Sequence, residues 1–155
     1  SIRSAKLNNI DYLSLLNPAD GSLFVVKNDG QKITSSLVGI GVSNSEFSQS
    51  ARFISFSQNN NLRTIDIEFI ERFSKPVNSI VSIHWFTNYQ LLVYKLDGPY
   101  IVDYDGENLI KLPPNISDGA TSSINYISDT KVILFLSAGK INYYSLQPKG
   151  SLINF

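Results

Sequence analysis

Histidine and cysteine, which supply most zinc ligands and many catalytic groups, are nearly absent from this 155-residue sequence, which contains one histidine, His84, and no cysteine. A zinc site needs several such ligands at a recognisable spacing, and a histidine base needs a nucleophile beside it. The sequence has no Gly-x-Ser-x-Gly elbow to supply a serine nucleophile. We therefore expect His84 to be a strand residue and the chain to be non-catalytic, without a metal ion or other cofactor.

An acidic cluster between residues 97 and 107 surrounds two Asp-Gly pairs. Asp97, Asp103, Asp105 and Glu107 carry oxygen atoms of the kind that calcium prefers. Their spacing lacks the later ligands and the closing glutamate of an EF-hand loop. Turns explain the same residues, because aspartate caps a turn and the glycine after it adopts a positive φ. We therefore predict turns here.

The charge and the aromatic residues of the sequence indicate whether the chain could bind nucleic acids or sugars. The 13 basic and 13 acidic residues balance to a net charge of zero, and the basic residues are scattered. Nucleic-acid binding depends on a basic surface, so no nucleic-acid partner is predicted. Tyrosines can stack on sugars or bases, but packing between sheets is the favoured interpretation. The five tyrosines concerned are Tyr100, Tyr104, Tyr126, Tyr143 and Tyr144.

No apolar run approaches the roughly 18–20 residues needed to cross a bilayer, so no membrane span is predicted. The first four residues are mostly polar and lack the apolar region of a signal peptide. The sequence contains no methionine, and we expect a soluble domain excised from a longer protein or a processed product. The compartment is left open, and export is one alternative.

Short β-strands separated by turn residues account for the whole chain. Apolar β-rich runs alternate with Asp-Gly or Asn-rich turns, which is typical of hairpins. In the first half of the chain, strands are expected at residues 2–7, 11–16, 22–27, 32–38, 52–57 and 62–69. Phe47 lies in a poorly defined strand, and residues 69–73 are compatible with a helical turn.

Residues 79–119 and 120–155 align without a gap at an offset of 41 residues. Trp85 matches Tyr126, and Leu91 matches Val132. Internal repetition at about forty residues is typical of propeller blades or solenoids. Val, Ile, Tyr and Phe dominate the repeated segments, which argues against helical repeats.

We therefore predict an all-β fold: one domain, residues 1–155, of about four four-stranded antiparallel propeller blades. The expected blades are residues 1–41, 42–78, 79–119 and 120–155. Several strands are apolar on both faces, and such strands need cover on both sides. Blades packed face to face supply that cover. A β-sandwich is the alternative fold, which explains the strands but not the repeat.

The run from Asp103 to Leu112, Asp-Tyr-Asp-Gly-Glu-Asn-Leu-Ile-Lys-Leu, resembles the blade turn of TolB-like (WD40-like) propeller repeats. Their pattern is Asp-x-Asp-Gly-x-Asn followed by leucine, and the run from Val26 to Thr34 is a weaker version. All four units have the strand-and-turn spacing of these repeats, and two of them have the turn motif. It implies a propeller fold and a tendency to bind partners, and it carries over no catalytic residues.

Four blades leave the closure of the propeller open. The alternatives are a closed four-bladed disc, half of an eight-bladed ring formed by two chains, or a stretch of a longer propeller. An open stretch would expose apolar blade faces. We therefore expect either closure or self-association through those faces, and slightly favour association.

The favoured function is a non-catalytic protein-interaction or scaffold module that binds a protein partner through one rim. Loops held by a rigid scaffold concentrate binding residues; here they would be the loops between blades (41–46, 75–79, 113–122) and those between second and third strands. One alternative is the substrate-gating propeller of a larger hydrolase or peptidase, and another is a closed propeller with an ion or small ligand in its channel. The candidate binding residues are Asn59, Asn60, Asn61, Asp97, Pro114, Asn115 and Asp118.

Overall fold

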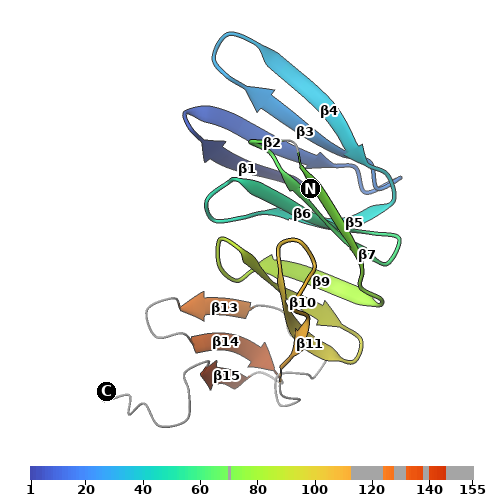
Figure 1. Cartoon of the computed structure of the whole chain (residues 1–155), viewed down its shortest axis with the longest axis vertical. Helices are drawn as coiled ribbons and strands as arrows, with labels where there is room; N and C mark the ends of the chain where they lie inside the picture. The colour runs from blue at the N-terminus through green and yellow to red at the C-terminus, as the bar shows by residue number, and fades with distance from the viewer. Residues whose placement is uncertain (70, 113–123, 128–131, 138–139, 146–155) are drawn as a thin grey trace.

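The computed structural model describes residues 1–69, 71–112, 124–127, 132–137 and 140–145. All regular elements in these residues are β-strands, and they form four sheets in which neighbouring strands are antiparallel. Figure 1 shows the sheets stacked in series along the long axis, with the first sheet at the top and the fourth at the bottom. The predicted all-β fold is confirmed, and each of the first three sheets has four antiparallel strands as predicted. Among the described residues, no helix could cross a lipid bilayer.

Each sheet is a meander, in which strands that are consecutive in the sequence lie side by side. The first sheet contains β1 (Ile2–Leu7), β2 (Ile10–Leu16), β3 (Leu23–Asn28) and β4 (Ile33–Gly39). The second contains β5 (Val42–Phe47), β6 (Phe53–Gln58), β7 (Asn61–Asp66) and β8 (Arg72–Pro76). The third contains β9 (Ile80–Trp85), β10 (Gln90–Lys95), β11 (Gly98–Asp103) and β12 (Ile110–Lys111). The described part of the fourth contains β13 (Ile124–Ile127), β14 (Val132–Ser137) and β15 (Lys140–Ser145).

An asparagine or aspartate ends the third strand of each of the first three sheets and organises the turn after it. Asn28 and Asp66 each accept a hydrogen bond from the backbone N–H two residues ahead, at 3.0 and 2.9 Å. Asp103 accepts one from the side-chain amide of Asn108 at 2.6 Å. Side chains of this type stabilise turns by such local bonds, so the turn interpretation of Asp103 is confirmed.

The second sheet departs from the sequence-based expectations in three places. Strand β7 ends at Asp66 rather than at residue 69, because the Asp66 carboxylate accepts the N–H groups of Glu68 and Phe69 and turns the chain. Strand β8 occupies 72–76, where a helical turn and then a loop were expected. Residues 42–47 form strand β5, where a loop over 41–46 and a poorly defined strand at Phe47 were expected. Its residues are mostly polar and give no apolar strand pattern, yet the segment pairs along its length with β6.

Hydrophobic cores fill the space between neighbouring sheets. We call the face of a sheet that points to the preceding sheet its leading face, and the opposite one its trailing face. Trailing residues Tyr12 and Leu23 of the first sheet pack with leading residues Ile54 and Phe56 of the second. The core between the second and third sheets consists of Phe53, Leu62, Val77, Ile83, Trp85, Leu91, Val93 and Val102. A third core joins Ile133 of β14 to the third sheet.

Candidate binding rim

Five loops of the first three sheets meet along one rim of the stack. We call this surface the Asn rim; it comprises residues 17–22, 40–41, 59–60, 77–79 and 96–97. Hydrogen bonds join these loops in series. Gly41 N–H donates to Asp20 O at 3.2 Å, and Val77 N–H donates to Asn60 O at 3.0 Å. Leu96 N–H donates to the carbonyl of Ser79 at 3.2 Å, so the rim is a connected surface rather than a set of separate loops.

The two asparagines at the tip of the β6–β7 hairpin adopt the left-handed conformation, in a turn that the sequence predicted. Asn59 and Asn60 have φ values of 50° and 59°, which suit a tight hairpin turn. The Asn61 side-chain amide donates to Asn59 O at 3.1 Å, so this residue supports the turn. The Gln58 side-chain amide donates to Ile40 O at 2.6 Å and ties the hairpin to the preceding loop. The exposed side chains of Asn59 and Asn60 are those available to a partner.

Two apolar residues of the Asn rim were not among the predicted binding residues. Ile40 is 58% exposed and Leu96 is 82% exposed. Each lies inside a turn sequence, beside Gly41 and beside Asp97-Gly98. A large apolar residue placed where a turn residue is expected was the signal that could have identified them.

Asp97, another predicted binding residue, is engaged within the chain. Its carboxylate accepts a hydrogen bond from the Tyr100 hydroxyl at 2.6 Å. The Lys111 and Lys95 ammonium groups lie 3.2 and 3.7 Å from it. The Tyr100 hydrogen bond, followed by the two lysines, lowers the pKa of Asp97 to about 2. Both ammonium groups also lie over the Tyr100 ring, that of Lys95 at 4.5 Å and that of Lys111 at 5.5 Å from its centre.

The remaining predicted site residues are not placed. Pro114, Asn115 and Asp118 lie outside the described residues. Whether they join the Asn rim therefore stays a prediction.

His84 lies on β9, an edge strand of the third sheet. Its Nδ1 is 3.2 Å from the Glu46 carboxylate of β5, the corresponding edge strand of the second sheet. In the part of the chain that the structure describes, no three histidine, aspartate or glutamate side chains gather as metal ligands would. The pair therefore links two neighbouring sheets, and its arrangement offers neither a nucleophile nor a metal centre.

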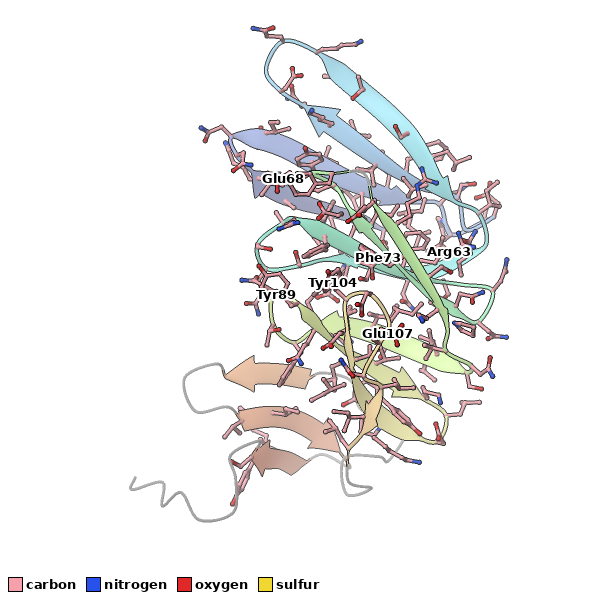
Figure 2. The ribbon with its side chains drawn as sticks, viewed as in Figure 1. Arg63, Glu68, Phe73, Tyr89, Tyr104 and Glu107 are labelled. Carbon is pink, nitrogen blue, oxygen red and sulfur yellow. The ribbon has the colours of Figure 1, made fainter. Side chains whose placement is uncertain are left out.

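Aromatic rings cluster between the second and third sheets, at the rim opposite the Asn rim. The Phe53 ring stacks on Tyr104 at 4.7 Å and on Trp85 at 5.9 Å, measured between ring centres. Tyr89 approaches Tyr104 edge-on at 6.2 Å, and Figure 2 shows these two rings at the junction of the two sheets. The buried Trp85 also donates its indole N–H to Glu46 O at 3.0 Å. Packing between sheets, as predicted, accounts for Tyr104.

Comparisons with known proteins bear on the fold. No protein-family model matches the sequence, and no curated protein matches it either. Among solved structures, the extracellular domain of the one-component system BT4673 from B. thetaiotaomicron is similar, with a TM-score of 0.66 and 11% identity. That match covers 96% of this chain and 21% of the other.

Two archaeal structures are also similar. The acylaminoacyl peptidase of Pyrococcus horikoshii has a TM-score of 0.55 and 14% identity, over 92% of this chain and 31% of that one. The β-propeller domain of the Trilobed protease from Pyrococcus furiosus, described as having an open velcro topology, has a TM-score of 0.52 and 13% identity. Here the match covers 93% of this chain and 58% of the other, so this chain spans less than two thirds of all three structures. At such identities the likeness shows the fold alone: the stacked sheets have the architecture of β-propeller blades.

Proposed function

We propose that the chain is a non-catalytic section of a β-propeller that binds a protein partner through the Asn rim. One observation carries the proposal: two large apolar side chains, Ile40 and Leu96, are exposed on loops that hydrogen bonds hold together. Apolar side chains on a preorganised surface are typical anchors for a protein partner, because little ordering entropy remains to be lost on binding.

The polar groups of the rim favour a partner chosen by shape and hydrogen bonding rather than by charge. Asn59 and Asn60 offer neutral amides, each with donors and an acceptor, which suit the backbone of a loop or an extended segment. The charge of Asp97 is compensated by two lysines. A depression of about 490 Å³ opens beside the rim between the first two sheets, lined by Leu16, Pro18, Asp20, Gly41 and Val42 among others. It has room for a side chain of the partner.

Selection of peptides from a random displayed library against the folded chain tests the proposal. Selected peptides are expected to lose at least about tenfold in affinity for Ile40→Asp and Leu96→Asp variants, since a buried unpaired carboxylate is costly. Leu109→Asp is the matched control, because Leu109 is exposed in the loop between β11 and β12, away from the Asn rim. If the selected peptides bind all three variants as tightly as the parent chain, the Asn rim is not the binding surface.

A second candidate function is the propeller of a larger peptidase, in which it would control access of substrate. Two of the similar structures belong to an acylaminoacyl peptidase and a protease. The full reading frame discriminates between the two candidates. A peptidase of this kind would place a Gly-x-Ser-x-Gly nucleophile elbow outside these residues, whereas the interaction module would not.

A further inference from the structure

We infer that the two end faces of the stack bind each other between copies of this chain, head to tail. The leading face of the first sheet in one copy would cover the trailing face of the fourth sheet in another. This inference goes beyond the proposed function, which concerns the rim and not the ends.

The leading face of the first sheet is apolar and uncovered. One row of paired residues crosses all four of its strands: Ile2, Leu15, Phe24 and Leu37. Leu13 and Val26 pair in the next row. Leu13 is 39% exposed, and Ile2, Phe24 and Leu37 are also exposed. The ion pair between Lys6 and Asp11, at 3.6 Å, neutralises the charge at the edge of this face.

The internal repeat identifies what such a face binds. Leu13 and Leu15 of β2 occupy the leading positions that Ile54 and Phe56 occupy in β6, and Leu91 and Val93 in β10. Those four counterparts are fully buried, each against the trailing face of the preceding sheet. The leading faces of the second and third sheets are thus each covered by the trailing face of the sheet before them. The first sheet has the surface but, within the described chain, no preceding sheet.

The fourth sheet offers the complementary surface. Ile133 of β14 is fully buried against the third sheet. Leu134 follows Ile133 on β14 and so points to the opposite, trailing face. Its partner on β15, Tyr143, lies on the same face. Ile141 is 78% exposed and Tyr143 is 74% exposed. Among the described residues, the chain therefore carries one uncovered face of each type, at opposite ends of the stack in Figure 1.

A second copy supplies both missing faces at once. The described part of the fourth sheet has three strands, which limits the contact area. Three six-residue strands that are about 4.8 Å apart and rise about 3.3 Å per residue give a face of roughly 290 Å². Each junction would bury roughly 570 Å² from its two partners, and a ring of two copies has two junctions. The resulting total of roughly 1,100 Å² exceeds the roughly 1,000 Å² that a biological interface needs. Head-to-tail contacts of this kind form a closed ring or, where the rotation does not close, an open chain of copies.

Light scattering after size exclusion of the 155-residue chain, over a range of concentrations, tests the inference. The parent chain is expected to be a dimer or a concentration-dependent series of larger species. Leu13→Asp on the leading face and Tyr143→Asp on the trailing face should each weaken association by at least about 100-fold. Leu109→Asp, at a leucine 41% exposed and outside both faces, is the matched control and should associate like the parent chain.

Mixing the two face variants makes the test specific to a head-to-tail contact. Each variant keeps one intact face, so an equimolar mixture should form a heterodimer with one junction, although neither variant associates alone. A monomeric parent chain at every concentration would overturn the inference. So would a mixture that, at the highest concentration reached, associates no more than either variant alone, or Tyr143→Asp homodimers, which would mean that leading faces pair with each other. Circular dichroism identifies any unfolded variant, and Phe24→Ser then replaces Leu13→Asp on the same face.

Discussion

Gly21 of the Asn rim lies in close contact with the first residue of the second sheet, Val42. Its φ is +68°, and its carbonyl accepts a hydrogen bond from Val42 N–H at 2.9 Å. A Cβ atom at this position would lie 2.6 Å from Val42 N and 2.8 Å from Val42 O. These are backbone atoms, which cannot rotate away as a side chain does. Gly21→Ala must therefore push the two sheets apart locally.

The free energy of unfolding that Gly21→Ala is expected to lose has two parts. An alanine in the left-handed region costs roughly 1–2 kcal/mol. Separating the backbones also weakens the bonds from Val42 N–H to Gly21 O and from Gly41 N–H to Asp20 O, at about 1 kcal/mol each. The total is about 3–4 kcal/mol, a large fraction of the roughly 5–15 kcal/mol that stabilises a typical domain.

Urea denaturation of Gly21→Ala and Gly30→Ala separates the two parts. Gly30 also has a positive φ, +85°, but no atom lies within 4 Å of the position that its Cβ would take. Gly30→Ala should therefore cost only the backbone part, roughly 1–2 kcal/mol of unfolding free energy. We expect Gly21→Ala to cost about 2 kcal/mol more than Gly30→Ala. Equal costs, within about 0.5 kcal/mol, would refute the argument that sheet contact makes this glycine necessary.

Three further substitutions test the packing and electrostatics. Trp85→Phe keeps an aromatic ring but loses the indole bond to Glu46 O, and should lower the free energy of unfolding by about 1–2 kcal/mol in denaturant titrations. Asp66→Ala leaves two backbone N–H groups unpaired at the end of β7 and should cost about 2 kcal/mol in the same assay. Because its pKa is lowered, Asp97 stabilises the fold above its ordinary pKa, and this contribution is lost as the pH falls through about 2. Tyr100→Phe removes the hydrogen bond that contributes most to lowering the Asp97 pKa, and it should raise the Asp97 midpoint in an NMR titration of its carboxyl carbon. An unchanged midpoint would contradict this assignment.

The sequence predicted most strands because their local signals are strong. Asp-Gly and Asn-Asn pairs bound the hairpins, and Asn59 and Asn60 adopt the conformation that these residue types tolerate best. Strand β5 was only poorly defined by the sequence, with Phe47 as its one large apolar residue, because the strand contains mostly polar residues. Ser45 is buried there, and the Glu46 carbonyl is used by an indole of the next sheet. Such contacts come from distant parts of the chain, which local patterns do not contain.

The candidate site was predicted less completely than the fold. The asparagine hairpin and Asp97 were selected from the sequence as candidate binding residues. The sequence did not show that Lys111 of β12 pairs with Tyr100 of β11, which brings a second cation to the Asp97 carboxylate. Exposure of Ile40 and Leu96 depends on where their loops point. Hydrophobicity alone marks such residues as core, and only their position inside turn sequences indicates that they lie outside it.

The meander of each sheet also has a kinetic consequence. Every described strand pairs only with strands next to it in the sequence, and each core joins consecutive sheets. Such contacts have a short sequence separation, which favours fast folding because little loop-closure entropy must be overcome before they form. We expect the first sheet to form while later residues are still being synthesised, with each completed sheet serving as the surface on which the next one assembles.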